Sequence, residues 1–289
     1  MKTPRIGIVV VTYNSGSFLG QFLESIPGAT RFDVDVVVSD NGSTDASLDL
    51  VRCHHPDVTI LETGANLGYG GAMNAGAALL PDADWLLIAN PDVILSAGSI
   101  DRLVEAALAN PGAGAVGPRI LQPDGTPYPS ARRLPTLFTG FGHALLATLA
   151  PQNPWSLRYR SESLLTETRT VPVGWLSGAC LLVSGELFRR MDGFDDRYFM
   201  YFEDVDLGRR IGLAGRENLF VPTSTVTHVG AHSTREQSAR MLRVHHRSAY
   251  IYLSSVYSGF RWLPVRLALR AGLSIRSRLL SRRIGQHSG

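Results

Sequence analysis

Short, unbroken apolar runs alternate with longer segments of mixed polarity along the first 120 residues. Runs of this kind are typical of strands that are buried on both faces of a parallel sheet. The segments between them have the length and polarity of helices. The pattern therefore predicts an α/β fold with a mostly parallel central sheet, helices on both faces and right-handed crossovers. The predicted strands are 6–12, 34–39, 58–62, 85–89 and 113–120, and the predicted helices are 16–25, 43–53 and 100–109.

The second half of the chain is less regular. Two strands, at 171–175 and 179–183, are expected on either side of a Ser177-Gly178 turn. Helices are expected at 185–191 and 204–214, and a last strand at 220–228. Residues 130–167 mix proline, arginine and apolar residues, which favours a mobile loop or short helices over the site.

Acidic residues follow two of the predicted strands. Asp40 ends the second strand, and Asp92 comes directly after the strand at 85–89. Ligands of open α/β sheets bind at the carboxyl ends of strands, where both residues are expected. Each also has a simpler interpretation, because Asp92 could cap a helix that begins near Ser96, and residues 41–44 could form an Asx turn and a helix cap. Asp40 itself could accept the imino N–H of a uracil or thymine base.

The segment 66–76 is rich in glycine and leads into a helix. Free backbone N–H groups at such a turn suit a sugar or phosphate oxygen. Small residues at this place are equally explained by tight packing of the helix on the sheet.

A cluster of three acids, Glu203, Asp204 and Asp206, follows an aromatic run. One or two of them could stabilise the positive end of a helix. That role does not easily explain all three, and a carboxylate beneath a substrate hydroxyl is what a general base requires. His228 ends the last predicted strand, where a histidine is usually structural, although it could also complete a metal site with Asp92.

Two nucleotide-binding motifs are excluded. Residues 112–117 match G-x-G-x-x-G, but they follow a helix and lead into Pro118, which is the wrong context for a dinucleotide site. The chain has one lysine, Lys2, and therefore no P-loop. Cys53 and Cys180 show no metal-ligand spacing and no disulfide framework, which indicates a reducing compartment. No apolar run reaches the roughly 18 residues that span a membrane.

The net charge of +3 hides an asymmetry. Residues 235–289 contain eleven arginines and one glutamate, a local charge of +10, and the rest of the chain carries −7. We expect a domain at 1–235 and a basic helical segment at 236–289, whose arginines and interfacial aromatic residues favour an anionic membrane surface. No nucleic-acid-binding motif accompanies the charge, so nucleic acid is not an expected partner. The simpler alternative is a helical pair that packs on the domain with a solvated basic face.

In their order along the chain, these motifs resemble inverting GT-A glycosyltransferases of family 2. The resemblance covers about residues 5–234 and rests on 10–14, 40–45, 66–68, 90–92, 175–179, Glu203-Asp204 and His228. Within the family, 90–93, 199–206 and the His-Val-Gly turn are most similar to bacterial rhamnosyltransferases that use dTDP-rhamnose. The resemblance implies transfer of a sugar from a nucleotide-diphosphate sugar to a glycan or polyprenyl-diphosphate-linked acceptor in cell-wall or other envelope glycan synthesis. It also implies a cytoplasmic enzyme, peripheral on the inner face of the cell membrane.

The resemblance implies a role for each motif. Asp204 would be the catalytic base, and Asp92 and His228 would hold a divalent cation, Mg²⁺ or Mn²⁺, against the donor diphosphate. The nucleotide would be bound by Thr12, Tyr13, Asn14, Asp40 and Asn90. The donor sugar and phosphate would be bound by Asn66, Gly68 and Asn74, and the acceptor would face Trp175, Ser177, Gly178, Ala179 and Glu203.

One position departs from the family pattern. The usual Asp-x-Asp motif has Asn90 as its first residue here, so the cation would be held largely by the substrate. Three alternatives stay open: a UDP-sugar transferase for O-antigen or capsule synthesis, a non-catalytic nucleotide-sugar binding module, and a nucleotidyltransferase. The last would need a basic residue in the first loop, and residues 10–20 contain none.

Overall fold

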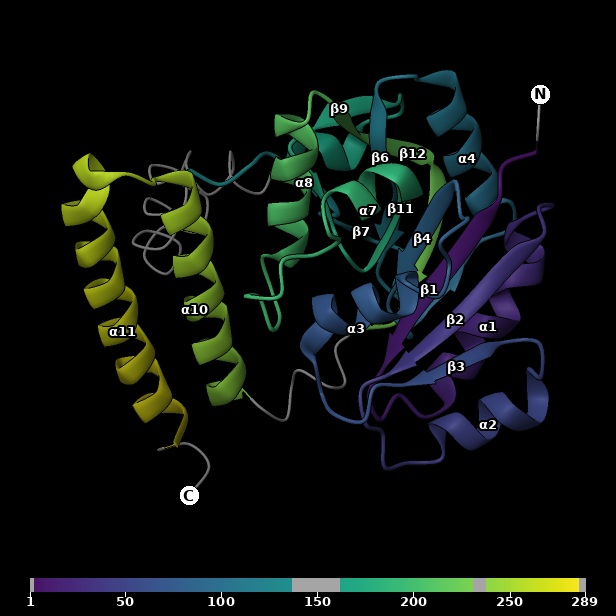
Figure 1. Cartoon of the computed structure of the whole chain (residues 1–289), viewed down its shortest axis with the longest axis horizontal. Coiled ribbons are helices and arrows are strands. Elements are labelled where there is room, and N and C mark those ends of the chain that lie inside the picture. The colour runs from purple at the N-terminus through teal and green to yellow at the C-terminus, as the bar shows by residue number, and fades with distance from the viewer. Residues whose placement is uncertain (1–2, 137–161, 231–237, 286–289) are drawn as a thin grey trace.

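Four parallel strands form one half of the central sheet (Figure 1). The computed structural model describes residues 3–136, 162–230 and 238–285. The four strands lie in the order β3 (Thr59–Glu62), β2 (Val34–Asp40), β1 (Ile6–Thr12) and β4 (Trp85–Ala89). All four were predicted from their apolar runs, with bounds that differ by one residue at most.

The other half of the sheet is mixed. Strand β11 (Cys180–Ser184) lies antiparallel between β4 and β6 (Ala113–Leu121), and β12 (Glu217–His228) continues parallel to β6. This arrangement brings the start of β11 next to the end of β4. Short strands pair antiparallel with these: β5 (Val93–Leu95) with β12, β7 (Pro127–Tyr128) with β6, and β9 (Val171–Val173) with β12. A separate two-stranded antiparallel sheet consists of β8 (Ala131–Arg132) and β10 (Trp175–Leu176).

Helices cover both faces of the sheet, as predicted. Alternate residues of β1 point to opposite faces, so Ile8 and Val10 join one core and Val9 and Val11 join another. The first core packs against α1 (Ser17–Ala29), α2 (Ser47–His54) and α4 (Ser99–Ala109). The second packs against α3 (Gly68–Ala77), α7 (Gly185–Arg190) and α8 (Glu203–Leu213), and a 3-10 turn, η1 (Glu162–Thr166), adds Leu164 at its edge.

Two predicted helix caps are absent. Helix α2 begins at Ser47 without a side-chain cap, and Ser43 and Thr44 instead bind Asn14. Asp92 does not cap a helix either, because β5 follows it and Gly98 precedes α4 in a left-handed conformation. Most of the loop predicted at 130–167 lies outside the described residues.

The basic C-terminal segment is helical. It forms α10 (Ser238–Val256), a 3-10 turn η2 (Phe260–Trp262) and α11 (Leu263–Gly285), which lies beside α10 (Figure 1). Helix α10 packs on the sheet domain, since Tyr252 is 1% exposed in a third core with Trp175, Tyr198 and Val205. Among the described residues, no helix is both long and apolar enough to cross a membrane.

Candidate active site

The order of the strands creates a crevice at one rim of the sheet. The chain runs outward from β1 through β2 to β3 and then returns to the other side of β1 as β4, so the order reverses between β1 and β4. Ligands of open α/β sheets bind at such a reversal, beyond the carboxyl ends of the strands. Thr12, Asp40 and Asn90 lie there, and the Asn90 N–H donates to the Ala179 carbonyl at 2.9 Å.

The residues predicted to bind a nucleotide lie in two interlocked loops. The Asn14 side-chain oxygen accepts from the Thr44 N–H at 2.7 Å, and the Asp40 carboxylate accepts from the N–H groups of residues 42 and 43. These contacts form the Asx turn that was the simpler interpretation of this segment, and Asp40 is buried. Thr12 is fully buried, whereas Tyr13 is 43% exposed and is free to stack on a base.

Packing explains the glycine-rich turn before α3. The N–H groups of Leu67, Gly68 and Tyr69 donate to the Asn41 side chain, the Asn66 side chain and the Phe199 carbonyl, all within 3.0 Å. They are therefore not free to bind a phosphate. Gly68 has φ +77°, and a Cβ there would lie 2.2 Å from the Phe199 oxygen. The Gly68 N–H and the Asn66 side-chain oxygen are thus used within the protein, and donor binding by these two residues stays a prediction.

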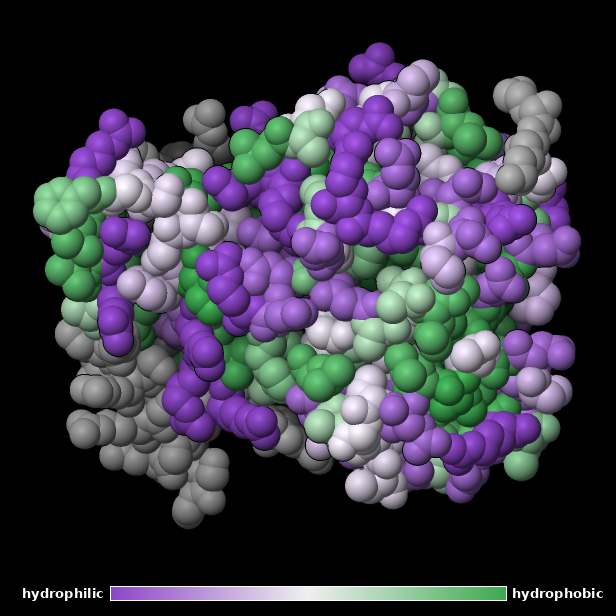
Figure 2. All heavy atoms as spheres, viewed as in Figure 1, coloured by the Kyte–Doolittle hydropathy of each residue, from purple (hydrophilic) through white to green (hydrophobic). Residues whose placement is uncertain are grey.

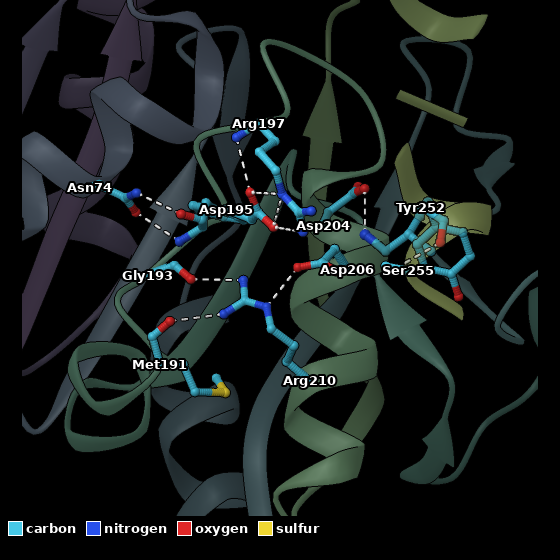
Figure 3. Close-up of polar contacts among 12 residues, drawn as sticks. Asn74, Met191, Gly193, Asp195, Arg197, Asp204, Asp206, Arg210, Tyr252 and Ser255 are labelled. Atoms are coloured by element: carbon cyan, nitrogen blue, oxygen red, sulfur yellow. Dashed lines mark hydrogen bonds and ion pairs between the residues drawn. The ribbon is translucent and has the colours of Figure 1, made fainter. Parts of the chain in front are cut away.

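Asn74 also has protein partners. Its side-chain oxygen accepts from the Phe194 N–H at 2.8 Å and its nitrogen donates to the Phe194 carbonyl at 2.8 Å, the two contacts drawn from Asn74 in Figure 3. The same nitrogen also donates to Asp196 at 3.1 Å. Both ends of the amide are thus occupied. Asn74 connects α3 to the segment that leads into the acid cluster, and its predicted contact with the donor stays a prediction.

Asp92 and His228 meet at the rim. Strand β12 pairs with β5 so that His228 lies opposite Val93, and the Val229 N–H donates to the Asp92 carbonyl at 2.9 Å. This pairing places His228 Nε2 3.0 Å from Asp92 Oδ1 and 3.4 Å from the Asn90 amide nitrogen. Residues 136 positions apart are therefore in direct contact, as the predicted metal pair requires.

The pair fits a divalent cation. Two ligands at about 2.1 Å from an octahedral Mg²⁺ or Mn²⁺, on adjacent vertices, are about 3.0 Å apart. The Asp92 oxygen and the His228 nitrogen are 3.0 Å apart, a hydrogen-bonding distance that also matches this spacing. In the described part of the chain no third His, Cys, Asp or Glu joins them. The protein would then provide two ligands, and substrate oxygens and water would provide the others.

The three acids at the start of α8 have different surroundings. Asp206 is buried and paired with Arg210, whose nitrogen lies 2.6 Å from its carboxylate and whose other nitrogens donate to the carbonyls of Met191 and Gly193 (Figure 3). Such a pair is structural, because removing either partner leaves a buried charge. Asp206 is therefore not available as a base, which leaves Glu203 and Asp204.

Glu203 and Asp204 form an unequal pair. Burial is the largest cause that raises the pKa of each, and the Asp204 charge raises the pKa of Glu203 further. Asp204 accepts from the Gly178 N–H at 3.0 Å and from the Val205 N–H at 2.8 Å, which stabilise its ionised form. Glu203 Oε2 is buried without a described hydrogen-bond partner. Glu203 therefore holds a proton more readily, and Asp204 is the carboxylate of the two.

Two residues that sequence reasoning missed complete the site. The Tyr69 hydroxyl donates to the Gly178 carbonyl, and burial followed by the charges of Glu203, Asp204 and Asp92 raises its pKa. Tyr69 thus lies among all these acids, but its place in a glycine-rich run gave no signal of this.

Arg132 is the second. Its guanidinium lies 5.4 Å from the Trp175 ring and lowers the pKa of Asp204, opposing the effect of burial. It comes from the proline-rich stretch without periodicity, which offered no basis for a prediction.

The predicted acceptor residues surround Asp204. The Ser177 N–H donates to the Ser130 carbonyl at 2.7 Å and the Ser177 hydroxyl accepts from the Ala179 N–H at 3.3 Å, which fixes the turn that carries Gly178. The Trp175 ring nitrogen donates to the Arg133 carbonyl. The rim therefore gathers the Asp204 carboxylate, a carboxylate–imidazole pair and a fixed turn between them.

Known proteins share this chain's sequence and fold. It is 47% identical over 97% of its length, and 94% of the relative's, to N-acetylglucosaminyl-diphospho-decaprenol L-rhamnosyltransferase of Mycobacterium tuberculosis. It is 28% identical to rhamnosyltransferase WbbL of Escherichia coli, over 86% of this chain and 92% of that protein. Its fold is similar to a mannosyltransferase from Pyrobaculum calidifontis solved with GDP-Man and Mn²⁺, with a TM-score of 0.59 and 19% identity over 100% of this chain and 77% of that one.

Residues 7–179 match the family described as Glycosyl transferase family 2. This match spans more than half of the chain and agrees with the resemblance carried by the motifs. The similarity to the Mycobacterium tuberculosis relative covers 97% of the chain and so extends beyond these residues. The chain is a glycosyltransferase and belongs to glycosyl transferase family 2.

Proposed function

We propose that this enzyme transfers L-rhamnose from dTDP-rhamnose to N-acetylglucosamine on a polyprenyl-diphosphate-linked acceptor in envelope glycan synthesis. The observation that carries the proposal is the 47% identity to a rhamnosyltransferase named for such an acceptor, over 97% of this chain. Asp40 and Tyr13 support a pyrimidine nucleotide, because a carboxylate can accept the base N3–H and the exposed ring can stack on the base. Asn14 and Asn90 would also contact the nucleotide.

The base at the start of α8 is Asp204 in this proposal. The acceptor hydroxyl attacks the anomeric carbon on the side opposite the diphosphate, and Asp204 takes the hydroxyl proton. One base is sufficient for an inverting displacement, and no protein nucleophile is needed. Trp175, Ser177, Gly178 and Ala179 form the surroundings of the acceptor, with protonated Glu203 beside the base.

Asp92 and His228 would hold a Mg²⁺ or Mn²⁺ ion against the donor diphosphate. When bound, such a cation neutralises charge that develops on the leaving group. Asn90 contributes a neutral amide near the pair, so the protein supplies one negative charge to this site. The Mn²⁺ present in the mannosyltransferase of similar fold supports the choice of metal.

The basic C-terminal helices would attach the enzyme to an anionic membrane surface, on the cytoplasmic face, where a lipid-linked acceptor would be found. Residues 240–283 carry ten arginines and no acid, and Phe260 is 88% exposed beside them. Apolar and basic residues of α11 are not separated onto two faces, since Arg266 projects on the side of Leu269 and Leu273. Electrostatic attachment is therefore expected rather than deep insertion.

The proposal predicts the nucleotide preference. Purified enzyme should transfer rhamnose from dTDP-rhamnose to a synthetic N-acetylglucosaminyl-diphospho-lipid, and dTDP should compete more strongly than UDP or GDP. Product mass and competition assays measure both. Tightest competition by GDP would overturn the nucleotide assignment. Preference for UDP-sugars would favour the related role in O-antigen or capsule synthesis.

The base assignment predicts that Asp204→Asn lowers turnover by roughly a hundredfold or more while donor affinity stays unchanged. Glu203→Gln is the matched control, and it should cost much less because Glu203 is held protonated. Burial raises the pKa of Asp204, and a base acts only when ionised. Turnover of the wild type should therefore fall as pH drops through that raised pKa, above the usual value of about 3.9. Near wild-type turnover of Asp204→Asn would refute the assignment.

The metal assignment predicts that EDTA abolishes transfer and that Asp92→Ala weakens Mn²⁺ binding in the presence of dTDP. Because the protein provides only two ligands, wild-type enzyme should bind Mn²⁺ weakly alone and more tightly with dTDP. Titration calorimetry measures both affinities without relying on turnover. Full activity in excess EDTA would contradict the metal assignment.

Membrane attachment predicts that the wild type co-sediments with vesicles containing phosphatidylglycerol at low salt and is released at high salt, because salt screens exposed charges. A chain that ends at Gly259 lacks α11 and should bind these vesicles less while retaining donor hydrolysis. If the wild type ignores such vesicles at low salt, the helical pair is structural.

A further inference from the structure

A cleft of about 330 Å³ lies where α10 meets the sheet domain. Its α10 wall consists of Arg240, Val244 and Arg247, with Ser248 at the edge. The opposite wall is formed by Leu67, from the turn before α3, and by residues 196, 197 and 199. The volume is within the range of small-molecule sites, which is about 300–1,000 Å³.

One face of α10 supplies the charge. Residues 240, 244 and 247 are four and three positions apart, which places them on one side of a helix. The cleft therefore has arginines separated by an apolar residue along this wall. In Figure 2, hydrophilic side chains gather over the lower half of α10, beside apolar side chains near α3.

The two α10 arginines have no anionic partner within the described residues. Arg197 is paired with Asp195 (Figure 3), and Asp196 accepts from the Asn74 amide. Arg240 and Arg247 take part in no ion pair in this part of the chain, and both are exposed. The lining has three arginines and one aspartate, and because Asp195 pairs with Arg197 the net charge around the cleft is +1, which suits an anion such as a diphosphate.

The remaining lining is apolar. Leu67 is 45% exposed, and Phe199 and Val244 are half-buried around the same space. Arginines next to exposed apolar side chains match an amphiphilic anion, in which a diphosphate is attached to a hydrocarbon chain. A free nucleotide or inorganic phosphate would leave the apolar wall without a partner.

A short chain of contacts joins the cleft to the base. The Phe199 carbonyl accepts from the Tyr69 N–H at 2.9 Å, and the Tyr69 hydroxyl donates to the Gly178 carbonyl. Gly178 in turn donates its N–H to Asp204 at 3.0 Å. On the other side, the Ser248 hydroxyl donates to the Met200 carbonyl at 2.8 Å. The cleft wall and the base are thus parts of one hydrogen-bonded unit.

We propose that this cleft binds the diphosphate and the first hydrocarbon unit of the lipid-linked acceptor, with Arg240 and Arg247 as the phosphate-binding residues. The assignment rests on the proposed function and adds to it the place where the acceptor's anionic linker is held. Its sugar can then extend along the wall formed by Phe199 toward Asp204. Bidentate arginine contacts would recognise the linker, and Leu67 and Val244 would contact the hydrocarbon.

Farnesyl diphosphate is the probe, because it carries a diphosphate and a hydrocarbon chain. Its binding can be measured without turnover. The double variant Arg240→Ala/Arg247→Ala should weaken its binding by roughly tenfold or more, the scale of lost charge-assisted hydrogen bonds. Arg243→Ala is the matched control, since this arginine is exposed on the same helix but does not line the cleft. Farnesol and inorganic diphosphate should each bind more weakly than the probe. Equal losses in the double variant and in Arg243→Ala, or no loss, would overturn the proposal.

Two further measurements distinguish binding of the acceptor's diphosphate from binding of membrane phospholipid. In transfer assays the double variant should raise KM for a diphosphate-linked acceptor and leave transfer to a neutral alkyl N-acetylglucosaminide unchanged. If the double variant no longer binds phosphatidylglycerol vesicles but binds farnesyl diphosphate with wild-type affinity, the two arginines bind the membrane surface and the proposal fails. If the wild type transfers sugar to neither acceptor, the proposed function is refuted. The binding comparison with farnesyl diphosphate would still test whether the cleft binds a lipid diphosphate.

Discussion

Two adjacent carboxylates at a buried helix start impose the main constraint on this structure. Glu203 and Asp204 cannot both be ionised cheaply where water is excluded, since each charge raises the cost of the other. The site resolves the conflict by giving Asp204 two backbone N–H donors and leaving Glu203 Oε2 without one. One of those donors belongs to Gly178, so the turn at residues 177–179 and Asp204, the proposed base, are fixed together.

The chain before the acids is strained, and α10 stabilises it. Tyr201 and Phe202 both have positive φ, 65° and 68°, a conformation that costs non-glycine residues of order 1–3 kcal/mol each. The Phe202 ring contacts Tyr252 and His245 of α10, and Tyr201 also contacts His245. Such strain persists only where packing determines the conformation. The basic C-terminal segment therefore has a structural connection to the acid cluster as well as an exposed surface.

Sequence patterns predicted the parts that depend on local chemistry. Apolar runs predicted the parallel strands, because a strand that is buried on both faces needs apolar residues throughout. The ends of the predicted strands placed Asp92 and His228 on one rim. Contacts between residues far apart in the sequence were not predictable, because they depend on tertiary packing. Examples are the antiparallel pairing of β11, the hydrogen bonds of Asn74 to Phe194 and the position of Arg132. Periodicity gives the face of an element and carries no information about which distant backbone will satisfy a side-chain amide.

The amide of Asn90 has a consequence for the order of binding. Its nitrogen lies 3.4 Å from His228 Nε2, next to Asp92. A carboxylate here would give the protein two negative charges at the metal position and would favour a resident cation. With Asn90 the protein would supply one negative charge, and a donor diphosphate would bring about two more, so a bound cation would gain most of its charge neutralisation from the substrate. In the proposed function, metal affinity and donor affinity would then be coupled, and loss of the nucleotide diphosphate would also weaken binding of the metal.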